Sequence, residues 1–310
     1  MDLLWLYILL GVILLLLCGV FFALFNVYKE TFYTPHKNQG NDLYLSSSMN
    51  YQGHNEEALE MIKNLQSIPC ETVYTKSYDG LKLCGYVYPK NGSNKVAIMC
   101  HGYRGTPRRD FSGGAVEMMK AGMNVLLIDE RGHGKSEGHS ITFGVREQKD
   151  VLSWIDFVKQ RFGDKVEIVL VGISMGGATV LFSADKVDDN IKIIADCPYS
   201  SPKDIISSTL EKLQMPPKFF YPIANLVSIL FCHTNLNKTS ALKTIKNSNH
   251  KILIIHGDSD TVVPHKLSEK IYLENKEKIR YELFPGADHG MCYLIDKQRY
   301  QKVVKEFLEE

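Results

Sequence analysis

The sequence predicts an α/β protein in which a mostly parallel sheet is covered by helices on both faces, with a transmembrane helix ahead of it. Short runs rich in Val, Ile and Leu recur between residues 95 and 257, and such runs are typical of strands buried on both faces. Patterns with a helical period separate these runs, and this alternation indicates a parallel sheet. The chain also opens with an uninterrupted apolar segment.

The apolar segment covers residues 3–25 and contains no Asp, Glu, Lys, Arg or His. As a helix it would reach about 34 Å, compared with roughly 30 Å for the hydrocarbon core of a bilayer. Trp5 and Tyr7 suit the headgroup interface. A cleaved signal peptide is disfavoured because no basic region precedes the apolar segment, the segment is longer than the usual ~7–15 residues, and no convincing A-x-A site follows it. A buried core helix is rarely so uniformly apolar. We therefore expect residues 1–28 to be an anchor that contacts the lipid bilayer through residues 3–25.

The flanking charges predict the orientation of this anchor. Asp2 precedes the apolar segment, and Lys29 and Lys37 follow it. Positive charge favours the cytoplasmic side, so we expect a membrane protein with a cytoplasmic catalytic domain.

The overall composition is that of an ordinary globular chain. Hydrophobic residues make up 45% and charged residues 23%, with a net charge of +1. This balance gives no electrostatic reason to expect a nucleic-acid partner. The seven cysteines are scattered without CxxC or Cys/His ligand spacing, so we expect neither a disulfide framework nor a metal.

The elements after the anchor can be taken in chain order. Residues 29–66 are rich in Tyr, Asn, Gln and Ser and predict a spacer, with a short helix near residues 56–65. Two strand-like stretches then flank Asp79-Gly80, which is a strong hairpin signal. The buried strands are expected at residues 95–100, 124–129, 166–172, 191–196 and 251–257.

Helices are expected between these strands. Val151, Ile155, Val158 and Phe162 recur with helical spacing and form one helix face. The interval from about residue 197 to residue 250 is too long for a simple crossover and contains several prolines, so we expect an inserted cap there.

One serine stands between glycines in the stretch GISMGG, at residues 172–177. A strand precedes Ser174 and a helical pattern follows it, and a tight turn between them lifts a serine above the sheet edge. The helix start adds free N–H groups and positive dipole potential. The alternative is a tight turn that merely contains a serine.

A serine nucleophile needs a base, and the base needs an acid to orient it. His289 lies in FPGADHGM, after a strand-like run. Asp258 and Asp260 both lie in HGDSDTVVP, after the strand at residues 251–255. The order Ser–Asp–His along the chain is the one expected for this topology. The pattern alone leaves the choice between the two aspartates open.

Two further loops are expected at the same edge of the sheet. In MCHGYRGTP, Gly102 and Gly105 allow backbone N–H groups to converge, as an oxyanion hole requires. We expect His101 to brace this loop rather than to act as a base. We expect the loop DERGHGKSEG at residues 129–138 to have a structural role. Ligands bind outside the carboxyl ends of the strands in such sheets, so these loops define a candidate site.

Together these motifs resemble those of the α/β-hydrolase superfamily, in particular its membrane-anchored prolyl-oligopeptidase-like and serine-aminopeptidase-like hydrolases. The resemblance spans roughly residues 67–310 and carries the hairpin SYDGLKLCGYVYP and the loops named above. It implies the α/β-hydrolase fold, with an eight-stranded, mostly parallel sheet and a helical cap. By this resemblance Ser174 is the nucleophile, Asp260 the acid and His289 the base, and Tyr103 and Met175 supply the oxyanion N–H groups.

The function implied is that of a serine hydrolase that cleaves a carboxylic ester through an acyl-enzyme. The expected partner is a small-molecule acyl substrate, lipid acyl esters included, and no cofactor is expected. A peptidase of the prolyl-oligopeptidase-like type is the closest alternative. A membrane-tethered binding protein without catalytic activity is a further alternative, because fold alone does not determine function.

Overall fold

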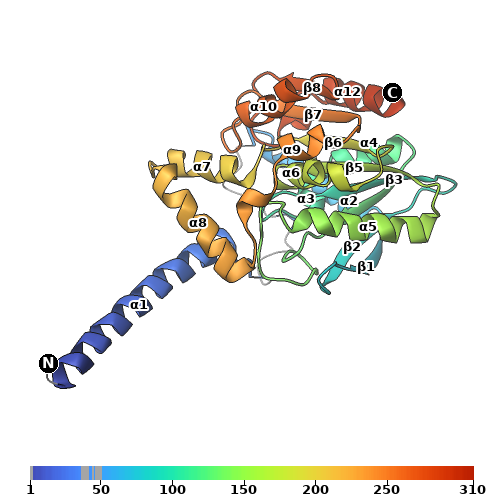
Figure 1. The fold of residues 1–310 in the computed structure, drawn as a ribbon. Coiled ribbons are helices and arrows are strands. Elements are labelled where there is room, and N and C mark those ends of the chain that lie inside the picture. Colours follow the sequence, from blue (N-terminus) through green and yellow to red (C-terminus); the bar gives the residue numbers. More distant parts are fainter. Residues whose placement is uncertain (1–2, 36–41, 44, 46–50) are drawn as a thin grey trace.

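A single eight-stranded sheet organises the protein in the computed structural model, which describes residues 3–35, 42–43, 45 and 51–310 (Figure 1). The strand order is β1-β2-β4-β3-β5-β6-β7-β8. Strands β1 and β2 form the predicted hairpin, β2 pairs antiparallel with β4, and the remaining pairs are parallel. The strands are β1 (Glu71–Lys76), β2 (Lys82–Tyr88), β3 (Lys95–Cys100), β4 (Asn124–Ile128), β5 (Glu167–Ile173), β6 (Lys192–Asp196), β7 (Ile252–Gly257) and β8 (Ile279–Phe284).

Helices cover both faces of the sheet, as the apolar runs predict. Along β3, Ile98 belongs to the core on one face and Met99 to the core on the other. Helices α5 and α6 pack on the first face, and α2, α4 and α12 pack on the second. These helices are α2 (Asn55–Ser67), α4 (Gly114–Lys120), α5 (Glu147–Phe162), α6 (Met175–Phe182) and α12 (Lys297–Glu309). Shorter or peripheral helices are α3 (Pro107–Asp110), α10 (Lys266–Glu274), α11 (Cys292–Ile295) and the 3-10 turn η2 (Ala184–Lys186).

The segment between β6 and β7 is helical and carries the expected prolines. It consists of α7 (Pro202–Lys212), α8 (Pro217–Cys232), η3 (Leu236–Lys238) and α9 (Ala241–Lys246). Prolines stand in the first turn of α7 and α8, where a missing N–H costs no helical hydrogen bond. Helix α9 packs on α6, whereas α7 and α8 form an elbow that stands away from the sheet beside the N-terminal helix (Figure 1).

The N-terminal helix α1 runs from Leu3 to Thr31, beyond the expected end of the anchor at residue 28. In the described part of the chain it is the one unbroken helix long and apolar enough to cross a membrane. Asp2 and Lys37, which enter the expected orientation, lie outside the described residues.

Part of the stretch expected as a spacer is folded onto the sheet domain. The side chain of Phe32 is fully buried, and its carbonyl oxygen accepts a hydrogen bond from the N–H of Ile141. Helix α2 buries Ile62 and Leu65. The described ends of residues 29–66 therefore contribute to the core, while residues 36–41, 44 and 46–50 lie outside the described residues.

Candidate active site

Ser174 occupies the turn between β5 and α6, where the sequence places it. Its backbone has φ 55° and ψ −115°, a conformation that a non-glycine residue adopts only when its surroundings enforce it. A Cβ atom on Gly176 would lie 1.8 Å from the carbonyl oxygen of Cys100, and one on Gly172 would lie 2.1 Å from that of Gly176. The two glycines let the helix start press against the end of β3, and this packing maintains the strained turn.

The structure brings His289 and Asp260 together with this serine. The Nε2 atom of His289 lies 3.0 Å from the Oγ of Ser174, although 115 positions separate them in the chain. The Nδ1 atom of His289 lies 2.7 Å from an Oδ atom of Asp260. The side chains of His289 and Asp260 are 8% and 0% exposed, so this contact is shielded from water. The imidazole therefore bridges a carboxylate and a hydroxyl group.

Asp260 is held in its ionised form by donors on both oxygens. The backbone N–H groups of Val262 and Val263 donate to one oxygen at 2.8 and 2.7 Å. The Nε2 atom of His256 lies 3.1 Å from the oxygen that contacts His289. Burial acts to raise the pKa of Asp260, but the hydrogen bonds from His256 and His289 hold this pKa well below its usual range.

Asp258, the other aspartate of the same loop, has a different environment. Its carboxylate accepts hydrogen bonds from the N–H of Gly286 at 2.7 Å and the hydroxyl of Ser259 at 2.9 Å. These contacts brace the turn after β8. The two aspartates left open by the sequence pattern are thus distinguished by their partners, since Asp260 contacts His289 whereas Asp258 bonds Gly286 and Ser259.

The loop after β3 lies directly against the serine. A Cβ atom on Gly102 would lie 3.4 Å from the Cβ of Ser174. The N–H of Gly102 donates to Asp110 at 2.9 Å, and the N–H of Glu130 donates to the Nε2 of His101 at 3.1 Å. Because this Nε2 accepts, the Nδ1–H of His101 donates to the carbonyl of Gly102 at 2.8 Å. The imidazole of His101 is therefore committed to bracing the loop, as expected.

The two residues expected to supply oxyanion N–H groups, Tyr103 and Met175, lie in this loop and next to it. Met175 is the first residue of α6, so its N–H has no acceptor within the helix. Tyr103 follows Gly102 in the loop, and its ring stacks on Phe143 with centroids 5.4 Å apart. Both expected oxyanion donors thus belong to backbone held in place by packing, which is the preorganisation that charge stabilisation requires.

The loop after β4 supports the loop after β3. Arg131 is buried and makes paired hydrogen bonds to Asp150 at 2.7 and 2.6 Å and to Asp79 at 3.1 Å. The Nε2 of His133 accepts from the N–H of Arg104 at 3.2 Å. This loop therefore connects the hairpin, α5 and the candidate oxyanion loop.

Comparison with known proteins agrees with the observed fold. Residues 92–215 match the family model described as serine aminopeptidase, S33. The structure of an esterase from Pyrococcus furiosus superposes with a TM-score of 0.64 at 26% identity, covering 80% of this chain and 92% of that one. The chain is an α/β hydrolase.

Two relatives extend the comparison over about three quarters or more of each chain. This α/β hydrolase is 25% identical to the Bacillus subtilis protein YqkD, over 74% of its own length and 76% of the relative. It is also 25% identical to YNL320W of Saccharomyces cerevisiae, which is described as a membrane protein, over 79% of this chain and 81% of that one.

One buried acid of the hydrolase was not singled out from the sequence. Asp196 ends β6, and its backbone carbonyl accepts the N–H of Ser174 at 2.8 Å. The hydroxyl of Tyr300 donates to one carboxylate oxygen at 3.2 Å, while the other has no hydrogen-bond partner among the described residues. Burial raises the pKa of Asp196 to about 7. The sequence signal that could have indicated this residue is the single acid at the end of the strand-like run IKIIAD.

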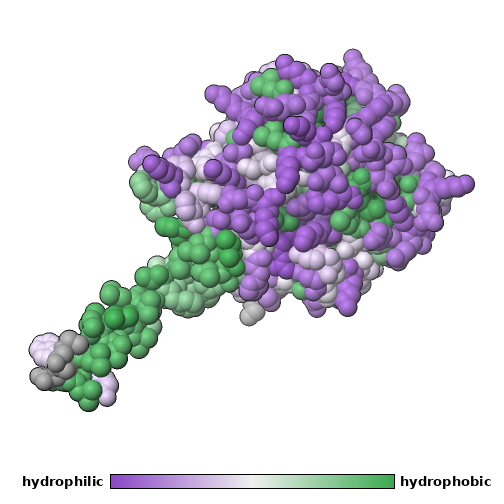
Figure 2. Space-filling view, in the orientation of Figure 1, coloured by the Kyte–Doolittle hydropathy of each residue, from purple (hydrophilic) through white to green (hydrophobic). Residues whose placement is uncertain are grey.

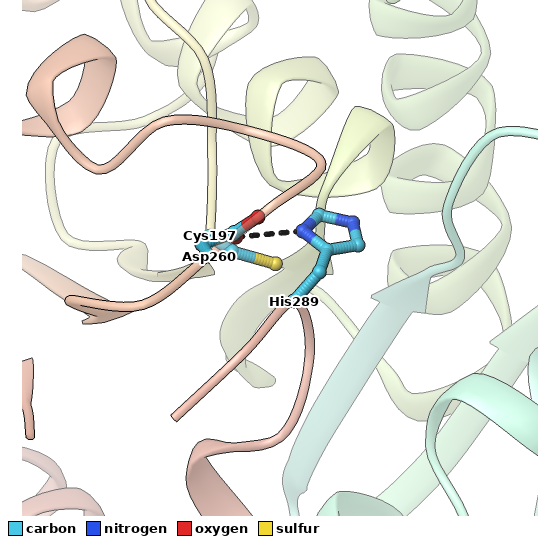
Figure 3. Close-up of side chains that lie close together, drawn as sticks. All are labelled: Cys197, Asp260 and His289. Carbon is cyan, nitrogen blue, oxygen red and sulfur yellow. Dashed lines mark hydrogen bonds and ion pairs between the residues drawn. The ribbon is translucent and has the colours of Figure 1, made fainter. Parts of the chain in front are cut away.

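Cys197 lies beside the Asp260–His289 pair, and these three residues offer the ligand types of a metal site (Figure 3). Two ligands of one tetrahedral zinc ion, each at about 2.1 Å, lie about 3.4 Å apart. The Nδ1 of His289 and the Oδ of Asp260 are 2.7 Å apart, which is a direct hydrogen bond. Burial also raises the pKa of the Cys197 thiol well above its usual value. The group fits a hydrogen-bonded pair with a neutral thiol beside it.

Proposed function

We propose that this hydrolase cleaves carboxylic esters of small-molecule acyl substrates through a serine acyl-enzyme. The observation that carries the proposal is the contact series from Asp260 through His289 to Ser174, with separations of 2.7 and 3.0 Å. These are the distances that a nucleophile, its base and the acid behind that base require.

In the first step, Ser174 Oγ attacks the acyl carbonyl carbon and its proton passes to His289 Nε2. Asp260 keeps the Nδ1 proton of His289 in place and stabilises the imidazolium that forms. The oxyanion is stabilised by the N–H groups of Tyr103 and Met175. His289 then gives its proton to the leaving alkoxide, and the C–O bond of the ester breaks.

In the second step, water replaces the alcohol. His289 takes a proton from that water, the resulting hydroxide attacks the acyl carbon, and the bond to Ser174 breaks. The proton returns to Ser174 Oγ and the carboxylic acid leaves. Every proton is carried by these side chains, so the cycle closes without a cofactor.

The choice of ester rests on the esterase from Pyrococcus furiosus, which aligns over most of both chains. A peptidase is the second candidate, because the serine aminopeptidase model matches residues 92–215. Both reactions use the same acyl-enzyme, and they differ in whether the leaving group is an alkoxide or an amine.

We also propose that α1 anchors the enzyme in a membrane with the catalytic domain on the cytoplasmic side. The length and apolar composition of α1 support the anchor, as does the membrane description of the yeast relative. Lys29, which follows the apolar segment, supports the orientation.

The test of the nucleophile is labelling of the full-length protein by a fluorophosphonate probe. Labelling should be lost in Ser174→Ala and retained in Ser67→Ala, a control on the exposed surface whose hydroxyl donates to the carbonyl of Asn64 in its own helix. Normal labelling of Ser174→Ala would overturn the assignment. An unlabelled wild-type protein would favour a non-catalytic binding role.

The test of the substrate class is a panel of p-nitrophenyl esters of graded chain length beside aminoacyl and prolyl amides. We expect the esters to be hydrolysed and the amides to be turned over at least about 100-fold more slowly, because an amine is the poorer leaving group. Preferential turnover of an amide would establish the peptidase instead.

A further inference from the structure

Helix α8 of the cap is apolar on its exposed side as well as on its buried side. Tyr221, Ala224 and Val227 face the core. The side chains on the opposite side are exposed to solvent, including Phe219 at 66% and Leu230 at 51%. The exposed apolar residues of α8 are Phe219, Phe220, Ile223, Leu226, Ile229 and Leu230. A helix on the surface of a water-soluble domain normally carries polar residues on its exposed face. We therefore expect an apolar partner to cover the exposed face of α8.

The charges of α8 allow such a partner. The helix contains no acidic residue, and Lys218 at its start is its one charged side chain. A lysine there can reach towards lipid phosphates while its alkyl stem lies along apolar surface. Burial of the exposed face of α8 against hydrocarbon therefore leaves no charged side chain buried without a partner.

The end of α8 is packed on the last turns of α1. The ring of Phe231 lies 5.9 Å from the ring of Phe21, 5.9 Å from that of Phe25 and 5.1 Å from that of Tyr28, centroid to centroid. The helical rise from Leu3 to Phe21 is about 27 Å, close to the roughly 30 Å of bilayer hydrocarbon. The contact with α8 therefore lies where α1 would emerge from the membrane.

The direction of α8 matches an interfacial helix. It runs across the end of α1 rather than alongside it (Figure 1). If α1 spans the bilayer, α8 lies near the plane of the membrane surface. The hydrophobic surface of α1 continues onto the base of the cap without a polar break (Figure 2).

A transmembrane course for α8 itself fits less well. The helix has 16 residues and passes the length and apolarity test only together with residues 236–246, at a bend of 104°. That second half includes Ala241, Thr244 and Ile245, which are buried in the sheet domain. Because its continuation belongs to the domain core, α8 can lie on a membrane but not cross it.

We propose that the exposed face of α8, defined by Phe219, Ile223, Leu226 and Leu230, is a second membrane contact that lies in the bilayer surface beside α1. The inference rests on the proposed membrane insertion of α1. The bilayer is the occupant because any partner on α8 must also lie beside the exposed apolar surface of α1, and lipid covers both. This contact positions the cap, and with it the candidate active site, at the membrane surface.

The experiment uses the full chain in phosphatidylcholine vesicles, with and without brominated acyl chains that quench tryptophan fluorescence. The background variant is Trp5→Phe, which leaves the fully buried Trp154 as a constant signal. Single tryptophans are introduced by Phe219→Trp, Ile223→Trp and Leu230→Trp. The matched control is Leu273→Trp, because Leu273 is an equally exposed leucine (54%) on α10, away from α1.

We expect the brominated lipid to quench the three α8 tryptophans about twofold or more, since an interfacial helix buries its apolar face ~5–10 Å into the headgroup boundary. The Leu273→Trp signal should not change. Leu15→Trp in α1 reports insertion of the anchor separately, because Leu15 is 74% exposed.

Three outcomes would overturn the proposal. If Leu15→Trp is quenched and the α8 positions are accessible to aqueous acrylamide, the anchor stands and α8 faces water. If the α8 positions are shielded from both quenchers, another protein surface covers them, a second copy included. If Leu15→Trp is not quenched either, the anchor and the α8 contact both fail.

Discussion

The hydroxyl of Tyr103 donates a hydrogen bond of 2.9 Å to the carbonyl oxygen of Thr31, which joins the end of α1 to the loop after β3. The guanidinium of the next residue, Arg104, donates to the carbonyl of Glu30 at 2.8 Å. The loop that carries the proposed oxyanion donor is thus tied to the helix that we propose to be the anchor. Under these proposals, the membrane anchor and the oxyanion loop are connected directly by these two hydrogen bonds.

The Tyr103→Phe variant tests this connection between α1 and the loop after β3. It removes the hydroxyl while retaining the backbone N–H and the stacking on Phe143. A hydrogen bond of this kind contributes about 0.5–1.5 kcal/mol to stability. We expect a lower thermal midpoint and an ester hydrolysis rate reduced by less than about tenfold, because the N–H donor remains. A variant with unchanged stability and rate would show that the bond contributes to neither.

The two aspartates of the loop after β7 should differ sharply in their effect on the rate. Asp260→Asn replaces the carboxylate that orients His289, and we expect kcat to fall by about 10⁴-fold, as for triads in which the tautomer is lost. Asp258→Asn is the matched control two residues away. It retains an oxygen acceptor for Gly286 and should keep kcat close to that of the wild type. Similar losses in both variants would argue against Asp260 as the acid.

The glycines of the turn at Ser174 should not tolerate a side chain. In Gly176→Ala the new methyl group would lie 1.8 Å from the carbonyl oxygen of Cys100, so the backbone would have to move. We expect a loss of several kcal/mol in the free energy of unfolding, or no folded protein, as for other severe overpacking.

Gly114→Ala provides the comparison on the other side of the sheet. Its methyl group would lie 3.6 Å from Met99 and Phe111, which is ordinary contact, within the helix α4. Alanine favours a helix over glycine, so we expect stability unchanged or raised by up to about 1 kcal/mol. Chemical denaturation of both variants checks the contrast, and equal destabilisation would contradict it.

The buried Asp196 predicts a pH-dependent stability. Its pKa is raised from the ordinary 3.8 to about 7 by burial, so ionisation is harder in the folded state than in the unfolded state. Burial of the ionised Asp196 carboxylate lowers the free energy of unfolding. This loss of stability is absent below about pH 4, grows as the pH rises towards 7 and is complete above it. Asp196→Asn removes this contribution and preserves an acceptor for Tyr300.

We therefore expect Asp196→Asn to gain stability over the wild type as the pH rises from 5 to 7, with the gain levelling off above pH 7. Thermal midpoints of the two proteins measured in parallel across this range check the prediction. A difference that does not vary with pH would show that the carboxyl group keeps the same protonation state throughout.

The strands and their layering could be predicted from the residue pattern, since burial on both faces of a parallel sheet demands runs of Val, Ile and Leu. The position of Ser174 could also be predicted, because a strand, glycines and a helix start are all local in sequence. The choice between Asp258 and Asp260 could not be made from pattern alone. Both follow β7 in one loop, and the carboxylate that contacts His289 depends on how that loop turns.

The described ends of residues 29–66 show another limit of local patterns. The polar composition predicts a spacer, yet Phe32 is fully buried and α2 contributes to the core. Single apolar side chains in a polar stretch carry no periodic signal. Their burial depends on the surface that the rest of the domain offers them.

The amino-acid pattern alone was enough to predict an apolar helix followed by an α/β sheet with a serine at a strand end, because these features depend on hydrophobic periodicity and local turns. Tertiary structure alone determined that His289 lies 3.0 Å from Ser174 and that α8 lies across the end of α1. Contacts between residues far apart in the chain depend on how whole elements pack. The same apolar helix can be buried, exposed to water or laid on a membrane, and only its neighbours in space decide which.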